Sequence, residues 1–127
     1  MNPYVEASQQ LIVELYTSDI RKSLRFYRSF GFELVREESD FMELKWEDSR
    51  LFLALGRAGS APPDFPLGNI RVMVPNVDEY WALLRTTGAR VIAAIGDRSY
   101  GLRDFTVAGP DGIGLRFATR LSDSATA

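Results

Sequence analysis

The chain carries one pattern of residues twice, and a repeat of this kind constrains the fold more than any other sequence feature. Shifting Ile12–Val35 by 57 positions, without a gap, places it over Asn69–Ile92. Apolar residues then fall on apolar residues, and Gly31 falls on Gly88. The sequence therefore predicts two copies of one structural unit, in which equivalent positions take equivalent places.

Each copy has the pattern of a βαβββ unit. Leu11–Thr17 alternates like a half-buried strand, and Asp19 offers an N-cap for a helix that runs to about Phe30 and ends at Gly31. Strands are then expected over residues 32–37, 41–46 and 50–55. The second copy predicts a strand over 69–74, a helix to about residue 87, and strands over 90–94, 104–107 and 113–118.

Module boundaries follow from this pattern and from a segment rich in turn residues. Gly56–Gly68 holds three Pro and three Gly in thirteen residues, which is typical of a linker. We expect a flexible N-terminus at residues 1–10, a first module at 11–57, a linker at 58–68, a second module at 69–120 and a disordered tail at 121–127.

Composition excludes several classes of function. A net charge of −2 and a pI near 5.2 argue against nucleic acid as a partner, and no transmembrane span or signal peptide is predicted. The chain has no cysteine, which favours a cytoplasmic location, and no histidine. Without either residue type, the commonest general base and the usual ligands of zinc, nickel or iron are missing.

Two tandem βαβββ units resemble the vicinal oxygen chelate superfamily, which includes glyoxalase I, extradiol dioxygenases, fosfomycin-resistance enzymes and bleomycin-resistance proteins. The resemblance is carried by Thr17–Phe32, by Tyr100–Phe105 (YGLRDF) and by Gly109–Gly112 (GPDG). It implies an α+β fold in which the two modules form a curved mixed sheet with a concave cavity. Because this fold hosts several chemistries, it does not by itself identify a reaction.

Strand alternation predicts which side chains line such a cavity. On the first strand of each module, every second residue faces the cavity. On the last strand, a second repeat match at an offset of 63 makes Leu53 the equivalent of Arg116. Trp46 at a strand end and Tyr100 on a loop are further candidates, although an interface or surface position suits Trp46 equally well and a core-capping position suits Tyr100 equally well. The candidate ligand-binding residues are Ile12, Glu14, Tyr16, Trp46, Leu53, Asn69, Arg71, Met73, Tyr100 and Arg116.

The family's metal-ligand positions carry over to Ile12, Leu53, Asn69 and Arg116. Aliphatic side chains donate no lone pair and a guanidinium repels a cation, so only Asn69 remains as a weak ligand. We therefore expect neither a metal nor a cofactor, which argues against metal-dependent glyoxalase or dioxygenase activity.

The leading hypothesis is a metal-free small-molecule-binding protein that resembles the bleomycin-resistance branch, an antibiotic-resistance class of homodimers. Two inward arginines, Arg71 and Arg116, outnumber one inward carboxylate, Glu14, so an anionic or aromatic ligand fits better than cationic bleomycin. A structural ion pair between Glu14 and either arginine explains these charges as well as a ligand role does. Arg103 and Asp104 are expected to form a structural pair.

Two alternatives remain open. One is a metal-independent enzyme of lyase or isomerase type with Glu14 as base and Arg116 as electrostatic partner, which a solvent-exposed Glu14 would argue against. The other is a non-catalytic dimeric regulatory module.

Overall fold

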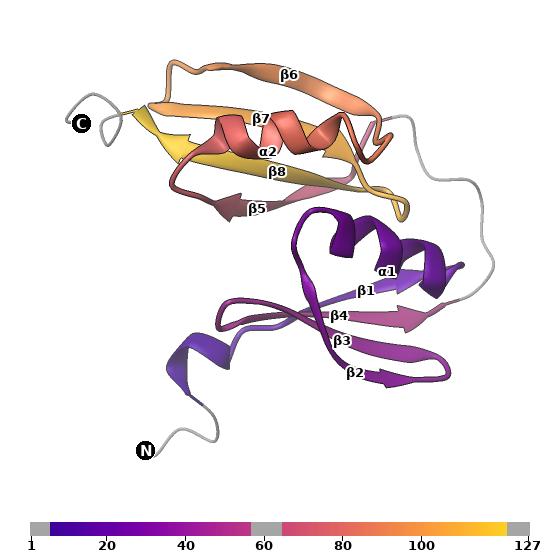
Figure 1. Cartoon of the computed structure of the whole chain (residues 1–127). Helices are drawn as coiled ribbons and strands as arrows, with labels where there is room; N and C mark the ends of the chain where they lie inside the picture. The colour runs from indigo at the N-terminus through magenta and orange to yellow at the C-terminus, as the bar shows by residue number, and fades with distance from the viewer. Residues whose placement is uncertain (1–5, 57–64, 122–127) are drawn as a thin grey trace. The chain divides into compact units, whose positions relative to one another are not determined.

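The computed structural model describes residues 6–56 and 65–121, and it contains both predicted βαβββ units (Figure 1). The chain divides into two compact units between residues 60 and 61, and each unit has its own four-stranded sheet and helix. The predicted α+β fold of two repeated modules is confirmed. No helix in the described ranges is long and apolar enough to cross a membrane.

The first unit follows the predicted order of elements, with these bounds: β1 (Val13–Thr17), α1 (Ile20–Ser29), β2 (Glu33–Glu38), β3 (Phe41–Trp46) and β4 (Ser49–Leu55). The strands lie in the order β1-β4-β3-β2, with β1 parallel to β4 and the other pairs antiparallel. Parallel strands need a long crossover connection, and the connection from β1 to β4 begins with α1. A short 3-10 helix, η1 (Ala7–Gln9), precedes the unit in the segment expected to be flexible.

The ends and the buried stripe of α1 match their sequence signals. The Asp19 side chain caps the helix by accepting a hydrogen bond from the Lys22 backbone N–H at 3.1 Å. Gly31 follows the helix with φ at +113°, a backbone conformation that residues with a Cβ rarely adopt. Ile20, Leu24, Tyr27 and Phe30 form an apolar stripe that is buried against the sheet.

The second unit repeats this topology, with these bounds: β5 (Gly68–Met73), α2 (Val77–Leu84), β6 (Val91–Asp97), β7 (Leu102–Ala108) and β8 (Ile113–Arg120). Its strand order is β5-β8-β7-β6, and β5 runs parallel to β8. Tyr80 of α2 stacks on Phe117 at 4.6 Å, and Trp81 meets Phe105 edge-on at 5.2 Å. Both aromatic residues of the helix therefore pack on the sheet.

The clearest differences from the predicted boundaries lie in the second unit. Helix α2 ends at Leu84 and not near Thr87, because the hydroxyls of Thr86 and Thr87 bond back to the Leu83 and Leu84 carbonyls, 2.8 Å away, in a closing turn. Strands β6 and β7 are longer than expected, since they pair with each other. Most of the expected linker and nearly all of the expected tail lie outside the described residues.

Each sheet has one face under its helix and one helix-free face. On β8, Leu115 and Phe117 lie under α2 and are fully buried, whereas Arg116 points to the helix-free face and is half-buried. This alternation agrees with the prediction for the last strand.

The sheet register corrects the second repeat offset by one residue. Glu14 pairs with Phe52, and its repeat equivalent Arg71 pairs with Arg116. Phe52, 64 positions before Arg116, is therefore the true equivalent of that arginine, and Leu53 is not. A one-residue shift exchanges the two faces of a strand, so it changes which residue of β4 belongs to a site.

Candidate functional site

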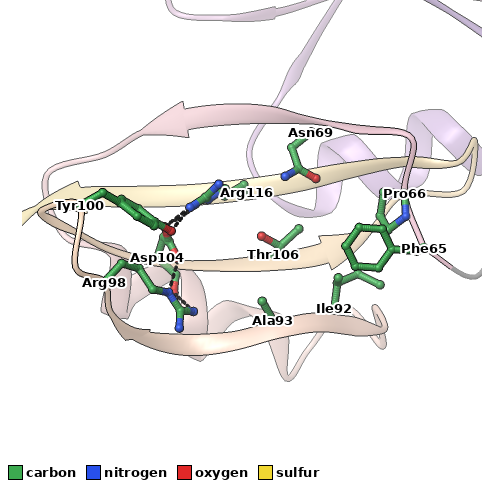
Figure 2. A pocket seen from close by; sticks show the side chains of 10 residues that line it. All are labelled: Phe65, Pro66, Asn69, Ile92, Ala93, Arg98, Tyr100, Asp104, Thr106 and Arg116. Atoms are coloured by element: carbon green, nitrogen blue, oxygen red, sulfur yellow. Dashed lines mark hydrogen bonds and ion pairs between the residues drawn. The ribbon is translucent and has the colours of Figure 1, made fainter.

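A hollow of about 330 Å³ lies on the helix-free face of the second sheet (Figure 2). Side chains from β5, β6, β7 and β8 and from the segments before β5 and β7 line it. They are Phe65, Pro66, Asn69, Ile92, Ala93, Arg98, Tyr100, Asp104, Thr106 and Arg116. The volume lies at the lower end of the range for small-molecule pockets.

A hydrogen-bonded cluster occupies one end of this hollow, with Asp104 at its centre. Arg98 Nε donates to Asp104 Oδ1 at 2.8 Å, and Arg116 donates to Oδ2 from Nε at 3.1 Å and from Nη2 at 2.5 Å. The Tyr100 hydroxyl donates to the same Oδ2 at 2.7 Å and accepts from Arg116 Nη2. Asp104 is only 2% exposed, so these neighbouring donors, and not water, compensate its negative charge.

The cluster keeps Asp104 ionised and Tyr100 protonated at neutral pH. Burial alone would raise the pKa of Asp104, but hydrogen bonds from Arg98, Arg116 and Tyr100 outweigh it and hold that pKa below its ordinary value. Desolvation of the Tyr100 hydroxyl, followed by its hydrogen bond to Asp104, raises the pKa of Tyr100. Asp104 is thus a stable anion and a weak base, suited to holding arginines in position.

The charges at this end do not balance. Two guanidinium groups and one carboxylate are the ionised side chains among the ten lining residues, which leaves one positive charge in excess. The Nη1 atoms of Arg98 and Arg116 have no hydrogen-bond partner among the described residues. The hollow therefore offers both charge and free donors to a ligand oxygen.

Asn69 reaches the middle of the hollow because Gly114 leaves room for it. A Cβ at Gly114 would lie 2.2 Å from Asn69 Oδ1 and 3.1 Å from Thr106 Cγ2. Gly114 pairs with Asn69 across β5 and β8, so the missing side chain is what lets the carboxamide lie over the strand. The glycine thereby sets the position of a polar group that both donates and accepts.

Three of the predicted site residues come together here: Asn69, Tyr100 and Arg116 line the same hollow. Arg71 and Met73 lie on β5 of the same unit and are exposed, but they do not line it.

The other candidates belong to the first unit, and two of them are corrected. Leu53 is fully buried on the α1 side of β4, as the register correction requires, and so lies in the core and lines no open cavity. Trp46 lies on the same side as Leu44 and packs edge-on against Phe32 at 5.2 Å. Leu53 and Trp46 therefore pack on the side of the sheet that α1 covers.

Ile12, Glu14 and Tyr16 are exposed at and just before β1. The carboxylate that binds Arg116 is Asp104 and not the nominated Glu14. Glu14's exposure is the result that argues against the enzyme hypothesis.

The Arg103–Asp104 prediction was wrong. Arg103 pairs with Asp78 at 3.1 Å and Asp97 at 3.0 Å, because neighbouring residues of a strand point to opposite faces. Asp104 shares its face with Arg116, two residues from its pairing partner Ala118. Sequence reasoning missed Arg98, Asp104 and Thr106 as site residues, and strand alternation along residues 104–106 was the signal that could have found the last two.

The residues at the family's metal-ligand positions do not fit a metal. With the corrected register these positions carry Ile12, Phe52, Asn69 and Arg116, of which only the Asn69 carboxamide offers a lone pair. Within residues 6–56 and 65–121, no group of three or more His, Cys, Asp or Glu residues is arranged to hold a metal ion.

This chain has two tandem βαβββ modules, and the second has a charged hollow on the helix-free face of its sheet. These features place it in a class of small α+β domains. The sequence pattern of the Glyoxalase/Bleomycin resistance protein/Dioxygenase superfamily matches residues 9–117, and the chain belongs to that superfamily. Among curated proteins, no significant match was found.

Solved structures with the same fold include members with different described roles. A glyoxalase/bleomycin resistance protein/dioxygenase from Alicyclobacillus acidocaldarius is 17% identical, with a TM-score of 0.73 over 92% of this chain and 95% of that one. A bleomycin-binding protein, solved in complex with bleomycin, is 19% identical, with a TM-score of 0.70 over 87% and 98%. A lactoylglutathione lyase from Agrobacterium tumefaciens is 19% identical, with a TM-score of 0.70 over 91% and 96%. At these identities the likeness establishes the fold.

Proposed function

We propose that this protein binds a small molecule in the hollow of its second unit, without a metal, and sequesters it as bleomycin-resistance proteins do. The observation that carries the proposal is the cluster around Asp104, which holds two arginines on an open sheet face with donors to spare. A concave site with a few convergent polar groups beside apolar walls is the usual form of a small-molecule site.

The positive excess at the hollow separates this proposal from bleomycin itself. Bleomycin is cationic, and a cation brought beside Arg98 and Arg116 would be repelled unless further carboxylates joined the site. A neutral or anionic ligand meets no such cost. The homodimer and a role in antibiotic resistance stay predictions that the family resemblance implies, and the cytoplasmic location stays a prediction from the lack of cysteine.

The experiment is ligand retention by the full chain. The purified protein is incubated with a small-molecule extract of cells, desalted and weighed by native mass spectrometry, and the retained compound is released and identified. A variant with Ala93→Trp fills the hollow and removes none of its charges. We expect retention by the wild type and none by the variant; no retention by either, or equal retention by both, would contradict the proposal.

No observation favours the metal-independent enzyme. Its proposed base, Glu14, is exposed, and the carboxylate beside Arg116 is held as an anion by three hydrogen-bond donors. A general base needs a pKa near the working pH, and the pKa of Asp104 is shifted away from it.

A further inference from the structure

We infer that the ligand of the second-unit hollow is a monoanionic carboxylate attached to an apolar, aromatic-sized body. This inference rests on the proposed function and names the chemical class that the site recognises. It follows from the unequal ends of the hollow, from its excess charge and from the fixed orientation of Arg116.

The hollow is polar at one end and apolar at the other. Figure 2 shows Arg98, Tyr100, Asp104 and Arg116 together at one end, and Phe65, Pro66 and Ile92 at the opposite end. Thr106 and Asn69 lie between the two groups. A ligand that satisfies both ends has a charged head and an apolar body, and a body of one or two rings suits a hollow of about 330 Å³.

Arg116 is held ready to donate from Nη1 to a ligand oxygen. Its guanidinium is 5.3 Å from the Tyr100 ring centroid and is bonded to Asp104 through two of its nitrogens. The side chain is only 16% exposed, yet Nη1 has no partner among the described residues. A partly buried donor without an acceptor is costly, and a ligand carboxylate can accept a charge-assisted hydrogen bond from Nη1.

The charge balance selects a monoanion. Asp104 neutralises one of the two arginines, so one added negative charge brings the cluster to neutrality. A dianionic phosphate would leave a negative excess beside a buried carboxylate, at a cost that rises as the site loses water. Phosphate shares the oxygen geometry, so the experiment includes it as a separate arm.

Isothermal titration of the full chain compares four probes: naphthoate, its neutral analogue naphthamide, naphthyl phosphate and acetate. Naphthoate has both head and body, and the other three change the charge or remove the body. We expect saturable naphthoate binding, tighter than naphthamide by about tenfold or more, which is the effect of one charge-assisted hydrogen bond. Acetate and naphthyl phosphate are expected to bind more weakly than naphthoate.

Substitutions of the two arginines test where the carboxylate of naphthoate binds. Arg116→Gln and Arg98→Gln should each weaken naphthoate about tenfold while leaving naphthamide unchanged. Arg71→Gln is the matched control, because Arg71 pairs with Arg116 in the sheet but does not line the hollow. Circular dichroism checks that each variant is folded, and Arg98, the more exposed of the two arginines, provides the second test if Arg116→Gln fails to fold.

The outcomes separate this inference from the proposed function. Equal binding of naphthoate and naphthamide, both lost in Ala93→Trp, would overturn the anion and leave small-molecule binding standing. Tighter binding of naphthyl phosphate would overturn the carboxylate. Absence of naphthoate binding, or an equal loss in Arg71→Gln, would overturn the inference, whereas retention by Ala93→Trp of the compound from the extract would contradict the proposed function instead.

Discussion

The two units share a backbone plan but differ in what fills their helix-free faces. In the second unit, Thr106 pairs with Arg116 beside the hollow; in the first, Glu43 pairs with Phe52 at the equivalent place. Phe52 meets Phe41 edge-on at 5.1 Å, and Arg36 lies over the Phe41 ring at 5.0 Å. The Phe41 and Phe52 rings therefore lie on the first sheet at the place where the second sheet has its charged hollow.

The two units also differ in how far their central carboxylates, Glu43 and Asp104, are exposed to water. Glu43 binds Arg36 at 3.5 Å and Arg50 at 3.2 Å, but its side chain is 20% exposed. Asp104 also binds two arginines, at closer range and with 2% exposure. Water reaches the Glu43 carboxylate and is largely excluded from the Asp104 carboxylate, so the same pairing of charges should contribute differently to stability.

The largest expected effect is at Asp104. Asp104→Ala leaves two arginines and the Tyr100 hydroxyl without their shared acceptor, and should lower the free energy of unfolding by about 2–3 kcal/mol. Glu43→Ala, its counterpart in the first unit, should cost less than about 1 kcal/mol. Urea denaturation measures both, and equal losses would contradict the contrast between the clusters.

The same contrast has a pH dependence. Because the folded pKa of Asp104 lies below its ordinary value, its contribution to stability is present above that ordinary value and is lost as pH falls through the folded pKa. The stability gap between wild type and Asp104→Asn should therefore be constant from pH 5 to 7 and shrink below about pH 4. Thermal melts over this range give the gap; one that widened on acidification would have the wrong sign.

An intermediate effect is expected at Gly114. The Cβ of Gly114→Ala collides with Asn69 Oδ1, so we expect a loss of about 1–2 kcal/mol and a displaced carboxamide. Gly68→Ala is the control, since a Cβ there meets no atom within 4 Å. Chemical denaturation of the two variants side by side decides the matter, and an equal cost at both positions would show that the close approach is not what selects Gly114.

The smallest effect is expected at Tyr100. Tyr100→Phe removes the hydroxyl that donates to Asp104 and accepts from Arg116; because the side chain is 58% exposed, the loss should be only about 0.5 kcal/mol. Tyr16→Phe is the first-unit control, because Tyr16 is 71% exposed and its hydroxyl bonds to no described residue. A loss at Tyr16 as large as that at Tyr100 would indicate a general effect of the hydroxyl.

The repeat made the fold predictable, because strand alternation and helix caps are local signals that α1 and β8 follow closely. It also predicted the faces of Asn69 and Arg116. The partner of Arg116 was not predictable in the same way, since ion pairing depends on cross-strand register, and a one-residue error at Leu53 moved that position from one face to the other. Arg98 was missed because it lies just after β6, where periodicity no longer reports direction.

The central claim is that the proposed ligand binds in the hollow of the second unit and not over the rings of Phe41 and Phe52 in the first. Nitrogen-15 NMR of the full chain titrated with naphthoate tests it most directly. We predict saturable shifts of the backbone amides of Asn69, Thr106 and Arg116, with those of Glu43 and Phe52 unchanged. Shifts centred on Glu43 and Phe52, or no saturable shift at the hollow, would contradict the account.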